Sequence, residues 1–331
     1  MQTDESFILV PGGAGYIGSV TCKYLKLAGF TPIVYDNLST GNKDAVKWGP
    51  FESGDIKDKT KLSSVITKYK PIAVMHFAAS IAAGESVNKP REYYDNNLLG
   101  TKSLLDVMLD HDIKNIVFSS TAAVYGNPVK LPIDEDHPLN PINPYGSSKL
   151  MIEQILKDYS HSYGLKFAAL RYFNAAGADL ELETGCQHEK PNNLIPIIMQ
   201  VLSGHIKKLQ IYGNDYKTED GTAIRDYIHV VDLAKAHILA LDHLLNDHGN
   251  LTLNLGTSIG NSVKEVVDNV ESITQQSINY SYEDRREGDA AILVANANKA
   301  SEILNWQAKH SDIKTIIDSA WQWHKKLHNI T

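Results

Sequence analysis

Residues 12–18 read Gly-Gly-Ala-Gly-Tyr-Ile-Gly and directly follow an apolar run at residues 7–10. Gly12, Gly15 and Gly18 have the spacing G-x-x-G-x-x-G, and a helical pattern continues from them. Glycines at this turn let the backbone approach a phosphate closely, and the N-terminus of the helix offers free N–H groups to it. A strand, a glycine turn and a helix in this order predict a pyrophosphate-binding loop that opens a dinucleotide-binding fold.

Strand and helix patterns alternate beyond this loop. Strands are expected at residues 32–36, 73–77, 116–119 and 167–171, with helices at 16–28, 94–110 and 145–163. This alternation predicts an α/β protein with a Rossmann-type doubly wound parallel sheet.

After Arg171 the rhythm becomes irregular, which predicts a smaller mixed α/β substrate-binding domain. Helices are expected near 193–204 and 313–328, a strand followed by a helix at 226–245, and a strand at 251–255. We expect a nucleotide-binding domain at residues 1–174 plus about 223–256, and a substrate-binding domain at about 175–222 plus 257–331.

An acidic residue ends the second expected strand. A carboxylate at Asp36 can accept hydrogen bonds from both ribose hydroxyls of an adenosine, and it would repel a 2′-phosphate. The next residues, Asn37 and Leu38, supply no cation to offset that repulsion. The cofactor is therefore expected to be NAD rather than NADP, with Asp55 and Ile56 close to its adenine.

A tyrosine and a lysine four residues apart, Tyr145 and Lys149, share one face of an expected helix. A nearby ammonium favours the phenolate and is expected to lower the pKa of the tyrosine, which can then act as a base. Thr121 follows a buried strand, at the edge where α/β sheets bind ligands, and its hydroxyl can bond a substrate hydroxyl. The three residues together predict hydride chemistry assisted by an acidic tyrosine.

Composition excludes several other classes of function. The 331 residues are 43% hydrophobic and 21% charged, as in ordinary globular proteins, and the net charge of -7 disfavours nucleic-acid binding. Two cysteines suggest no disulfide framework, and neither a signal peptide nor a membrane span is expected. A cytoplasmic location follows as the expectation. The 13 histidines are scattered, and His237, His243 and His248 do not share a helix face, so no metal is assigned.

Longer segments resemble the UDP-glucose 4-epimerase family of the extended short-chain dehydrogenase/reductase superfamily. The resemblance extends from the first strand to the last helix and is carried by residues 84–87, 93–97, 170–174, 191–194, 212–216, 225–229, 254–256 and 285–289.

The resemblance implies roles for individual residues. Tyr145 would be the catalytic base and acid, Lys149 its activator, and Thr121 a hydroxyl relay that also contacts the sugar. The NAD site would be lined by Gly12, Gly15, Tyr16, Ile17, Asp36, Asn37, Asp55, Ile56, Phe77, Asn96, Tyr145, Lys149 and Tyr172. The UDP moiety would be held by Asn174, Asn193, Leu194, Tyr212, Arg225, Arg286 and Asp289, and Leu293 would gate the sugar pocket. A homodimer is implied on the same basis.

The chain departs from the family at a few positions. Pro11 stands where threonine is usual, and Ile81 replaces a lysine near the nicotinamide ribose, a change that can weaken NAD retention. The expected reaction is reversible C4 epimerisation of UDP-glucose and UDP-galactose through a 4-keto sugar. UDP-xylose and UDP-arabinose, dual hexose and pentose use, and N-acetylhexosamine sugars stay open as alternatives. Ala122 and Ala123 argue against a 4,6-dehydratase, which carries Asp-Glu there. A non-catalytic NAD sensor is disfavoured because Tyr145 and Lys149 are both present.

Overall fold

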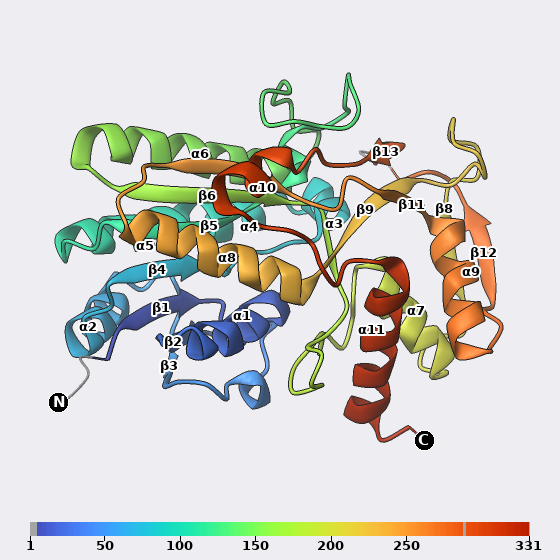
Figure 1. The fold of residues 1–331 in the computed structure, drawn as a ribbon, viewed down its shortest axis with the longest axis horizontal. Helices are drawn as coiled ribbons and strands as arrows, with labels where there is room; N and C mark the ends of the chain where they lie inside the picture. The colour runs from blue at the N-terminus through green and yellow to red at the C-terminus, as the bar shows by residue number, and fades with distance from the viewer. Residues whose placement is uncertain (1–4, 287–288, 331) are drawn as a thin grey trace.

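The computed structural model of the chain describes residues 5–286 and 289–330. A seven-stranded sheet in the order β10-β6-β5-β4-β1-β2-β3 forms its larger part, and every neighbouring pair is parallel (Figure 1). Its strands are β1 (Phe7–Pro11), β2 (Thr31–Asp36), β3 (Phe51–Ser53), β4 (Ala73–His76), β5 (Asn115–Thr121), β6 (Lys166–Tyr172) and β10 (Leu251–Leu255). The predicted doubly wound α/β fold is confirmed.

Helices cover both faces of this sheet. One face packs against α1 (Tyr16–Leu27), α8 (Val230–Leu245) and α10 (Asn298–Leu304). The other packs against α2 (Lys59–Tyr69), α5 (Gly100–Asp110) and α6 (Pro144–Tyr163). Shorter helices are α3 (Ala83–Asn88), α4 (Pro90–Tyr93), the 3-10 turns η1 (Lys43–Ala45) and η3 (Ala122–Val124), and the π-helical η2 (Tyr94–Leu99).

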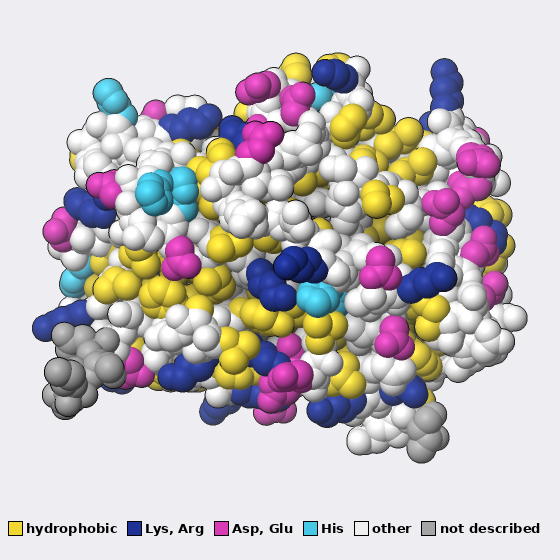
Figure 2. All heavy atoms as spheres, viewed as in Figure 1, with side chains coloured by type: hydrophobic (Ala, Val, Ile, Leu, Met, Phe, Trp, Pro, Cys, Tyr) yellow, Lys and Arg dark blue, Asp and Glu magenta, His cyan; other side chains and the backbone are white. Residues whose placement is uncertain are grey.

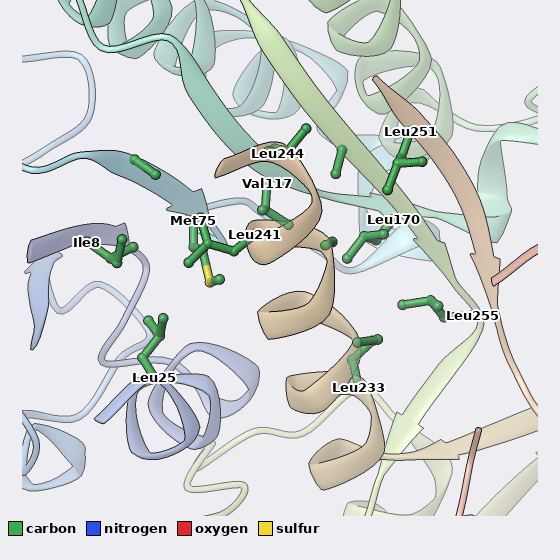
Figure 3. Packing of buried hydrophobic residues seen from close by; sticks show 14 of the residues in the cluster. Ile8, Leu25, Met75, Val117, Leu170, Leu233, Leu241, Leu244, Leu251 and Leu255 are labelled. Carbon is green, nitrogen blue, oxygen red and sulfur yellow. The ribbon is translucent and has the colours of Figure 1, made fainter. Parts of the chain in front are cut away.

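Each strand supplies both hydrophobic cores because successive side chains point to opposite faces. Ile8 and Val10 lie in the core beneath α1 and α8, while Leu9 between them lies in the core beneath α5 and α6. Figure 3 shows the first of these cores, where Leu241 of α8 lies near Met75 and Val117 of the sheet. Continuous apolar strands are the pattern expected of a sheet that is buried on both faces.

The strand order reverses beside β1. The chain builds β2 and β3 on one side of β1, and then crosses to build β4, β5, β6 and β10 on the other side. Ligands of open α/β sheets bind beyond the carboxyl ends of the strands at such a reversal. The carboxyl ends of β1 and β4 are therefore where a cofactor is expected to bind.

Smaller sheets build the second part of the molecule. β9 (Ile224–His229) pairs with β7 (Asn174–Ala176), β11 (Gly260–Ser262) and β13 (Ile292–Leu293), while β8 (Leu209–Tyr212) pairs with β12 (Tyr280–Glu283). A separate hydrophobic core joins them to α7 (Leu194–Leu202), α9 (Val263–Thr274) and α11 (Ile313–His328). These elements lie together on one side of the larger sheet in Figure 1.

The two-domain division stays a proposal, with one refinement. β9 belongs to the second sheet system, and α8, which begins at Val230, covers the first sheet. We therefore propose that the return to the first domain begins after His229 rather than near residue 223.

One expected helix is divided. The pattern at residues 94–110 becomes η2 followed by α5. The wider π-helical turn presents Asn97 to the backbone of Ser80: Ser80 N donates to Asn97 Oδ1 at 2.8 Å, and Asn97 Nδ2 donates to Ser80 O at 3.0 Å. A periodicity argument does not reveal this local change of pitch.

Acidic and basic side chains are interspersed over the face drawn in Figure 2, with apolar side chains between them. Within the described residues, no helix combines the length and apolar character needed to cross a membrane.

Candidate active site

The glycine loop joins β1 to α1 at the strand reversal. Gly12 adopts φ +82°, and a Cβ there would lie 2.4 Å from the backbone nitrogen of Ala78. A Cβ at Gly18 would lie 2.2 Å from Gly12 O. Gly15 occupies the N-cap of α1 without a side chain to block access to the helix N-terminus. The loop thus has the open backbone cradle that a pyrophosphate requires.

Asp36 lies beside this loop at the end of β2. Ala14 N donates to its Oδ2 at 3.1 Å and Leu38 N donates to its Oδ1 at 2.8 Å. Burial raises the pKa of Asp36, and these two N–H bonds oppose the rise. Asn37 Nδ2 donates to Asp55 Oδ2 at 3.1 Å, so the fold brings the predicted ribose and adenine residues together.

Residues 77–80 connect the glycine loop to α6. Phe77 N and Ala78 N both donate to Pro11 O, at 2.8 Å and 2.9 Å. Asn96 Nδ2 donates to the Ser80 hydroxyl at 3.1 Å, and the neighbouring Asn97 donates to the Ser148 hydroxyl of α6 at 3.2 Å. The predicted cofactor residues Phe77 and Asn96 therefore belong to one hydrogen-bonded segment between the glycine loop and α6.

Tyr145 and Lys149 occupy the first turns of α6, as predicted. Asn143 caps the helix, since its Oδ1 accepts from Gly146 N at 2.9 Å. A Cβ at Gly146 would lie 2.5 Å from Ala123 O, so glycine at this position lets the helix approach the end of β5. The Thr121 side chain lies close enough to the Tyr145 hydroxyl to lower its pKa. The three predicted catalytic residues are thus neighbours in space.

The electrostatics differ from the sequence expectation that Lys149 lowers the pKa of Tyr145. Burial raises the pKa of Tyr145, and the nearby Thr121 side chain opposes the rise. Burial also lowers the pKa of Lys149 to about 7, against the attraction of Glu153. Lys149 Nζ donates to Ser119 O at 2.8 Å. In the protein alone the pKa of Tyr145 therefore moves opposite to the expected direction, because burial is the larger effect and Lys149 is not among the groups that shift it.

A buried polar network behind Lys149 was missed from the sequence. Arg171 donates to both carboxylate oxygens of Glu153, at 3.0 Å and 2.6 Å, and to Tyr125 Oη at 3.0 Å. Ser120 Oγ donates to the same carboxylate at 2.5 Å. The signal was present, since Glu153 continues the four-residue spacing of Tyr145 and Lys149 along one helix face.

Tyr172 and Ile56, two further residues predicted to line the NAD site, make the following contacts. The Tyr172 hydroxyl bonds the Ser119 hydroxyl, next to the carbonyl that holds Lys149. Ile56 is buried, and a Cβ at Gly100 would lie 2.6 Å from its Cδ1. Ile56 therefore contributes mainly to packing. Ile81, the departure from the family's lysine, is 48% exposed.

The N-terminal turn of α1 contacts the second part of the molecule. Tyr16 Oη donates to Gly177 O at 2.6 Å, and Ile17 packs against the core beneath α1 and α8. Asn174 lies in register with Tyr227 in the β7–β9 pair. Gly177 directly follows β7, so its bond with Tyr16 joins the start of α1 to the segment that carries Asn174.

Predicted UDP-binding residues form two groups. Arg225 lies in β9 and donates to Asp289 Oδ1 at 3.1 Å. The Arg286 guanidinium lies 3.8 Å from the ring centre of Tyr212. Asn193 occupies the N-cap position of α7, which begins at Leu194, but its side chain makes no capping hydrogen bond. Glu287 and Gly288, in the segment that carries part of the family resemblance, lie outside the described residues.

Leu293 connects these residues to the catalytic segment. It is in register with Arg225 in the β9–β13 pair. It also packs against the cluster of Ala122, Val124 and Tyr125, which directly follows Thr121. The predicted gate therefore lies between Arg225 and the segment that follows the predicted catalytic residue Thr121.

Asp179, Glu181 and Glu183 place their oxygens close together. Lys23 Nζ lies 2.7 Å from each of these carboxylates, which raises the pKa of that lysine. An ammonium already occupies the position that a cation would take.

Comparisons with known proteins agree with this geometry. The model of the NAD dependent epimerase/dehydratase family matches residues 8–256. A UDP-glucose 4-epimerase of Rhizobium meliloti is 49% identical over 319 residues, which cover 96% of this chain and 97% of the relative. The UDP-glucose 4-epimerase of Brucella ovis in complex with NAD superposes with a TM-score of 0.93 at 49% identity, covering 96% and 98% of the two chains. That of Bifidobacterium longum in complex with NAD+ and UDP gives 0.94 at 41% identity, covering 98% and 100%.

Proposed function

This chain belongs to the NAD dependent epimerase/dehydratase family, and from that premise we propose that it interconverts UDP-glucose and UDP-galactose by reversible epimerisation at C4. The observation that carries the proposal is the contact of the Thr121 hydroxyl with Tyr145, one helical turn before the buried Lys149. This arrangement moves a proton to or from a sugar hydroxyl.

NAD fits the residues of the first domain. The glycine cradle has no room for a Cβ at Gly12 or Gly18, and Asp36 presents a buried carboxylate beside it. Bound NAD supplies a reversible hydride acceptor for C4 of the sugar. Gly15, Tyr16 and Ile17 would receive the pyrophosphate at the N-terminus of α1, and Asp36 would accept from ribose hydroxyls.

Side chains of this protein would transfer the proton of the sugar C4 hydroxyl. Tyr145 would accept the proton of the C4 hydroxyl and later return it, while Thr121 bonds the same oxygen. Because burial raises the pKa of Tyr145, its phenolate would need the positive charges of protonated Lys149 and of bound NAD beside it. Lys149, fixed on Ser119 O, supplies positive charge when it is protonated. Because burial brings its pKa to about 7, its charge responds to other charges in the crevice.

The uridine diphosphate would be held by the second domain. We assign the pyrophosphate to Arg225 and Arg286, since guanidinium groups bind phosphate oxygens through charge-assisted hydrogen bonds. Asn174, Asn193, Leu194, Tyr212 and Asp289 complete the proposed grip. Leu293 would face the sugar, which must turn within the pocket before hydride returns to its other face.

Product analysis by NMR tests the proposal. The protein is incubated separately with the glucose, galactose, xylose, arabinose and N-acetylhexosamine forms of UDP-sugar, with Tyr145→Phe as the inactive control. Appearance of the galactose form from the glucose form, and the reverse, is expected. Conversion confined to the pentose pair would replace the proposed substrate. No conversion of any sugar by protein that retains NAD would overturn the epimerase proposal.

Cofactor identity is tested by denaturing the purified protein and assaying the released nucleotide. NAD(H) is expected because Asp36 faces the glycine loop. Released NADP(H) would contradict the role given to Asp36.

We also propose a cytoplasmic homodimer, from the family resemblance. Leu99 and Met151 are 52% and 45% exposed, which leaves apolar surface for a partner chain. Light scattering during size-exclusion chromatography would give twice the mass of the chain.

A further inference from the structure

A row of buried polar residues crosses three neighbouring strands on the face of the sheet that α6 covers. Ser120 of β5 is in register with Arg171 of β6, and Arg171 is in register with Asn254 of β10. Residues in register on adjacent strands project to the same face of a sheet. Ser120 and Arg171 both donate hydrogen bonds to Glu153, which lies on α6. The sheet thus presents a hydroxyl and a guanidinium to a carboxylate of this helix.

Glu153 has a second cation within reach on its own helix. Lys149 lies four residues earlier, the spacing that makes oppositely charged side chains neighbours on a helix. Glu153 and Lys149 are 1% and 3% exposed, so little water screens the attraction between their charges. The structure nevertheless directs them to different partners. Lys149 Nζ donates to Ser119 O at 2.8 Å. The Glu153 carboxylate accepts from Arg171 at 3.0 Å and 2.6 Å.

We propose that Arg171 is a positioning residue, which neutralises the Glu153 carboxylate and so leaves the charge of Lys149 free for the proton transfer. The effect on turnover rests on the proposed epimerisation, whereas the competition between Arg171 and Lys149 for one carboxylate is a property of the folded chain. Arg171 has the advantage in that competition because a planar guanidinium donates two parallel hydrogen bonds to a carboxylate, while an ammonium is a point charge. Lys149 is therefore left to a neutral carbonyl.

Arg171 is itself fixed from its other side. Its Nη1 donates to the Tyr125 hydroxyl at 3.0 Å, and that hydroxyl donates to Asn254 Oδ1 at 2.7 Å. Asn254 Nδ2 in turn donates to Ile133 O at 2.9 Å. The guanidinium carbon also lies 5.1 Å from the ring centre of Tyr125. These contacts hold the guanidinium in the orientation that faces Glu153, so the carboxylate has a counterion of fixed position.

The surroundings of Lys149 allow a change in the charge of this pair to reach the ammonium. Burial lowers the pKa of Lys149 to about 7, and the charge of Glu153 opposes that change. The ring centre of Phe118 lies 4.8 Å from Lys149 Nζ. Burial keeps the imidazole on β4 unprotonated by lowering its pKa, and it keeps the phenols on α6 and β6 protonated by raising theirs. These three uncharged side chains near the ammonium are His76, Tyr145 and Tyr172.

Opposite changes of charge at the pair test the proposal. Arg171→Met leaves the carboxylate uncompensated, so the titration midpoint of Lys149 should rise by about one pH unit or more. Glu153→Gln leaves the guanidinium uncompensated, so the midpoint should fall by a similar amount. Each variant loses one half of the same ion pair, and a merely structural role would disturb both alike. The midpoint is measured by NMR of isotope-labelled lysine in the NAD-loaded protein, with Lys149→Met to assign the signal.

Turnover provides the second measurement. In Arg171→Met the freed carboxylate competes with Ser119 O for the ammonium, so kcat for the UDP-sugars should fall at least about tenfold, while UDP affinity stays within about twofold. The double variant Glu153→Gln/Arg171→Met removes both charges. It should return the midpoint toward that of wild type and recover most of the lost turnover. Asp158→Asn, which removes an exposed carboxylate from α6, is the control and should move neither quantity.

Midpoints that move in the same direction in the two single variants, or that do not move, would overturn the proposal. So would a double variant that stays as slow as Arg171→Met. Bound NAD content and circular dichroism verify folding, and if a single variant does not fold, the midpoint and turnover of the double variant decide. A wild-type protein that converts no UDP-sugar would reject the proposed function and leave the NMR titration as an independent test of the competition for Glu153.

Discussion

At the scale of single residues, the candidate site depends on Lys149, whose nearby carboxylate, Glu153, is already paired with Arg171. Lys149 is buried, and the carboxylate one helical turn further along α6, that of Glu153, accepts hydrogen bonds from two of the three guanidinium nitrogens of Arg171. Burial therefore dominates, and the pKa of Lys149 falls to about 7. Near neutral pH the protein alone holds this side chain partly neutral, so small changes in nearby charge alter its protonation.

Tyr145→Phe removes only the hydroxyl that is proposed to exchange the proton. Turnover is expected to fall by roughly 10²- to 10⁴-fold, the usual contribution of a positioned acid–base group. UDP affinity should stay within about twofold, since Tyr145 makes no proposed contact with the nucleotide. Turnover by coupled assay and UDP affinity by calorimetry are compared with Tyr163→Phe, an exposed tyrosine on the same helix. Near-normal turnover in Tyr145→Phe would remove the basis of the mechanism.

Lys149→Met should change the pH dependence of stability. The lysine titrates near 10.5 when unfolded and near 7 when folded, so between these values the unfolded chain binds more protons. This contribution to stability is therefore lost as the pH falls from 10.5 to 7. Methionine does not titrate, so the variant does not lose stability in this way. Between pH 10.5 and 7, the free energy of unfolding of the variant minus that of wild type should therefore rise by up to about 1.4 kcal/mol for each unit by which the pH decreases.

Denaturant unfolding at pH 7, 8 and 9 measures this difference. Lys157→Met, on the exposed face of α6, is the control and should show no such trend. A difference between Lys149→Met and wild type that is independent of pH would contradict the low pKa of Lys149.

At the scale of elements, the active site depends on how closely α6 approaches the end of β5. Gly146 lies against Ala123 O, and Asn143 fixes the first turn of the helix. These contacts place Tyr145 beside Thr121. The tyrosine–lysine motif therefore needs its glycine for packing between elements, in addition to the two side chains that are proposed to carry the chemistry.

Gly146→Ala should be destabilising although alanine favours helices, because its Cβ would lie 2.5 Å from a backbone oxygen. Overpacking of this kind typically costs about 1–3 kcal/mol, and displacement of α6 should also lower turnover. Gly84→Ala in α3 is the control, since a Cβ there meets open space and should be neutral or stabilising by up to about 1 kcal/mol. Urea unfolding and turnover of both variants are the measurements. Equal effects of the two substitutions would disprove the close-approach argument.

The sequence predicted elements best where periodicity is strong. The glycine loop, α1, the central strands and α6 were expected because apolar runs and glycine turns have local signatures. η2 was missed because its π-helical pitch follows from bonds between Asn97 and Ser80, which are distant in sequence. The short strands β7, β11 and β13 carry too few residues for a periodic signal, and β9 was expected to belong to the first domain.

The residues of the candidate site could be predicted from the sequence, but their pKa values could not. Tyr145, Lys149 and Thr121 could be chosen from spacing, and the fold brings them together. The direction of the pKa change of Tyr145 was not predictable from spacing. It depends on how much water the fold excludes, which only the packed structure reveals.

At the scale of the whole molecule, buried histidines make the fold sensitive to acid. His76, His229 and His237 are fully buried, and burial lowers the pKa of each, to about 3 for His76 and to about 4 for the other two. Unfolded histidines titrate near 6.5, so the unfolded chain takes up more protons below that pH. Stability is therefore present above pH 6.5 and falls as the pH decreases toward 4.

His237→Leu should reduce the loss of free energy of unfolding on acidification, by up to about 1.4 kcal/mol per pH unit between pH 6.5 and 4. The measurement is the free energy of unfolding at pH 7.0 and 5.5, relative to wild type. His161→Gln, which replaces an exposed histidine, should follow wild type. A His237→Leu curve parallel to that of wild type would show that this residue does not contribute to the acid response.

The ion pair of Glu153 and Arg171 has a consequence for the evolutionary history of this protein. Both side chains are almost fully buried. A mutation that replaces either one leaves the other as a buried charge without a counterion, which lowers the free energy of unfolding by about 3–5 kcal/mol. Joint replacement by apolar residues of similar volume carries no such cost. Lineages that descend from this chain should therefore keep the two residues or lose them together, and single-site drift at either position should be removed by selection.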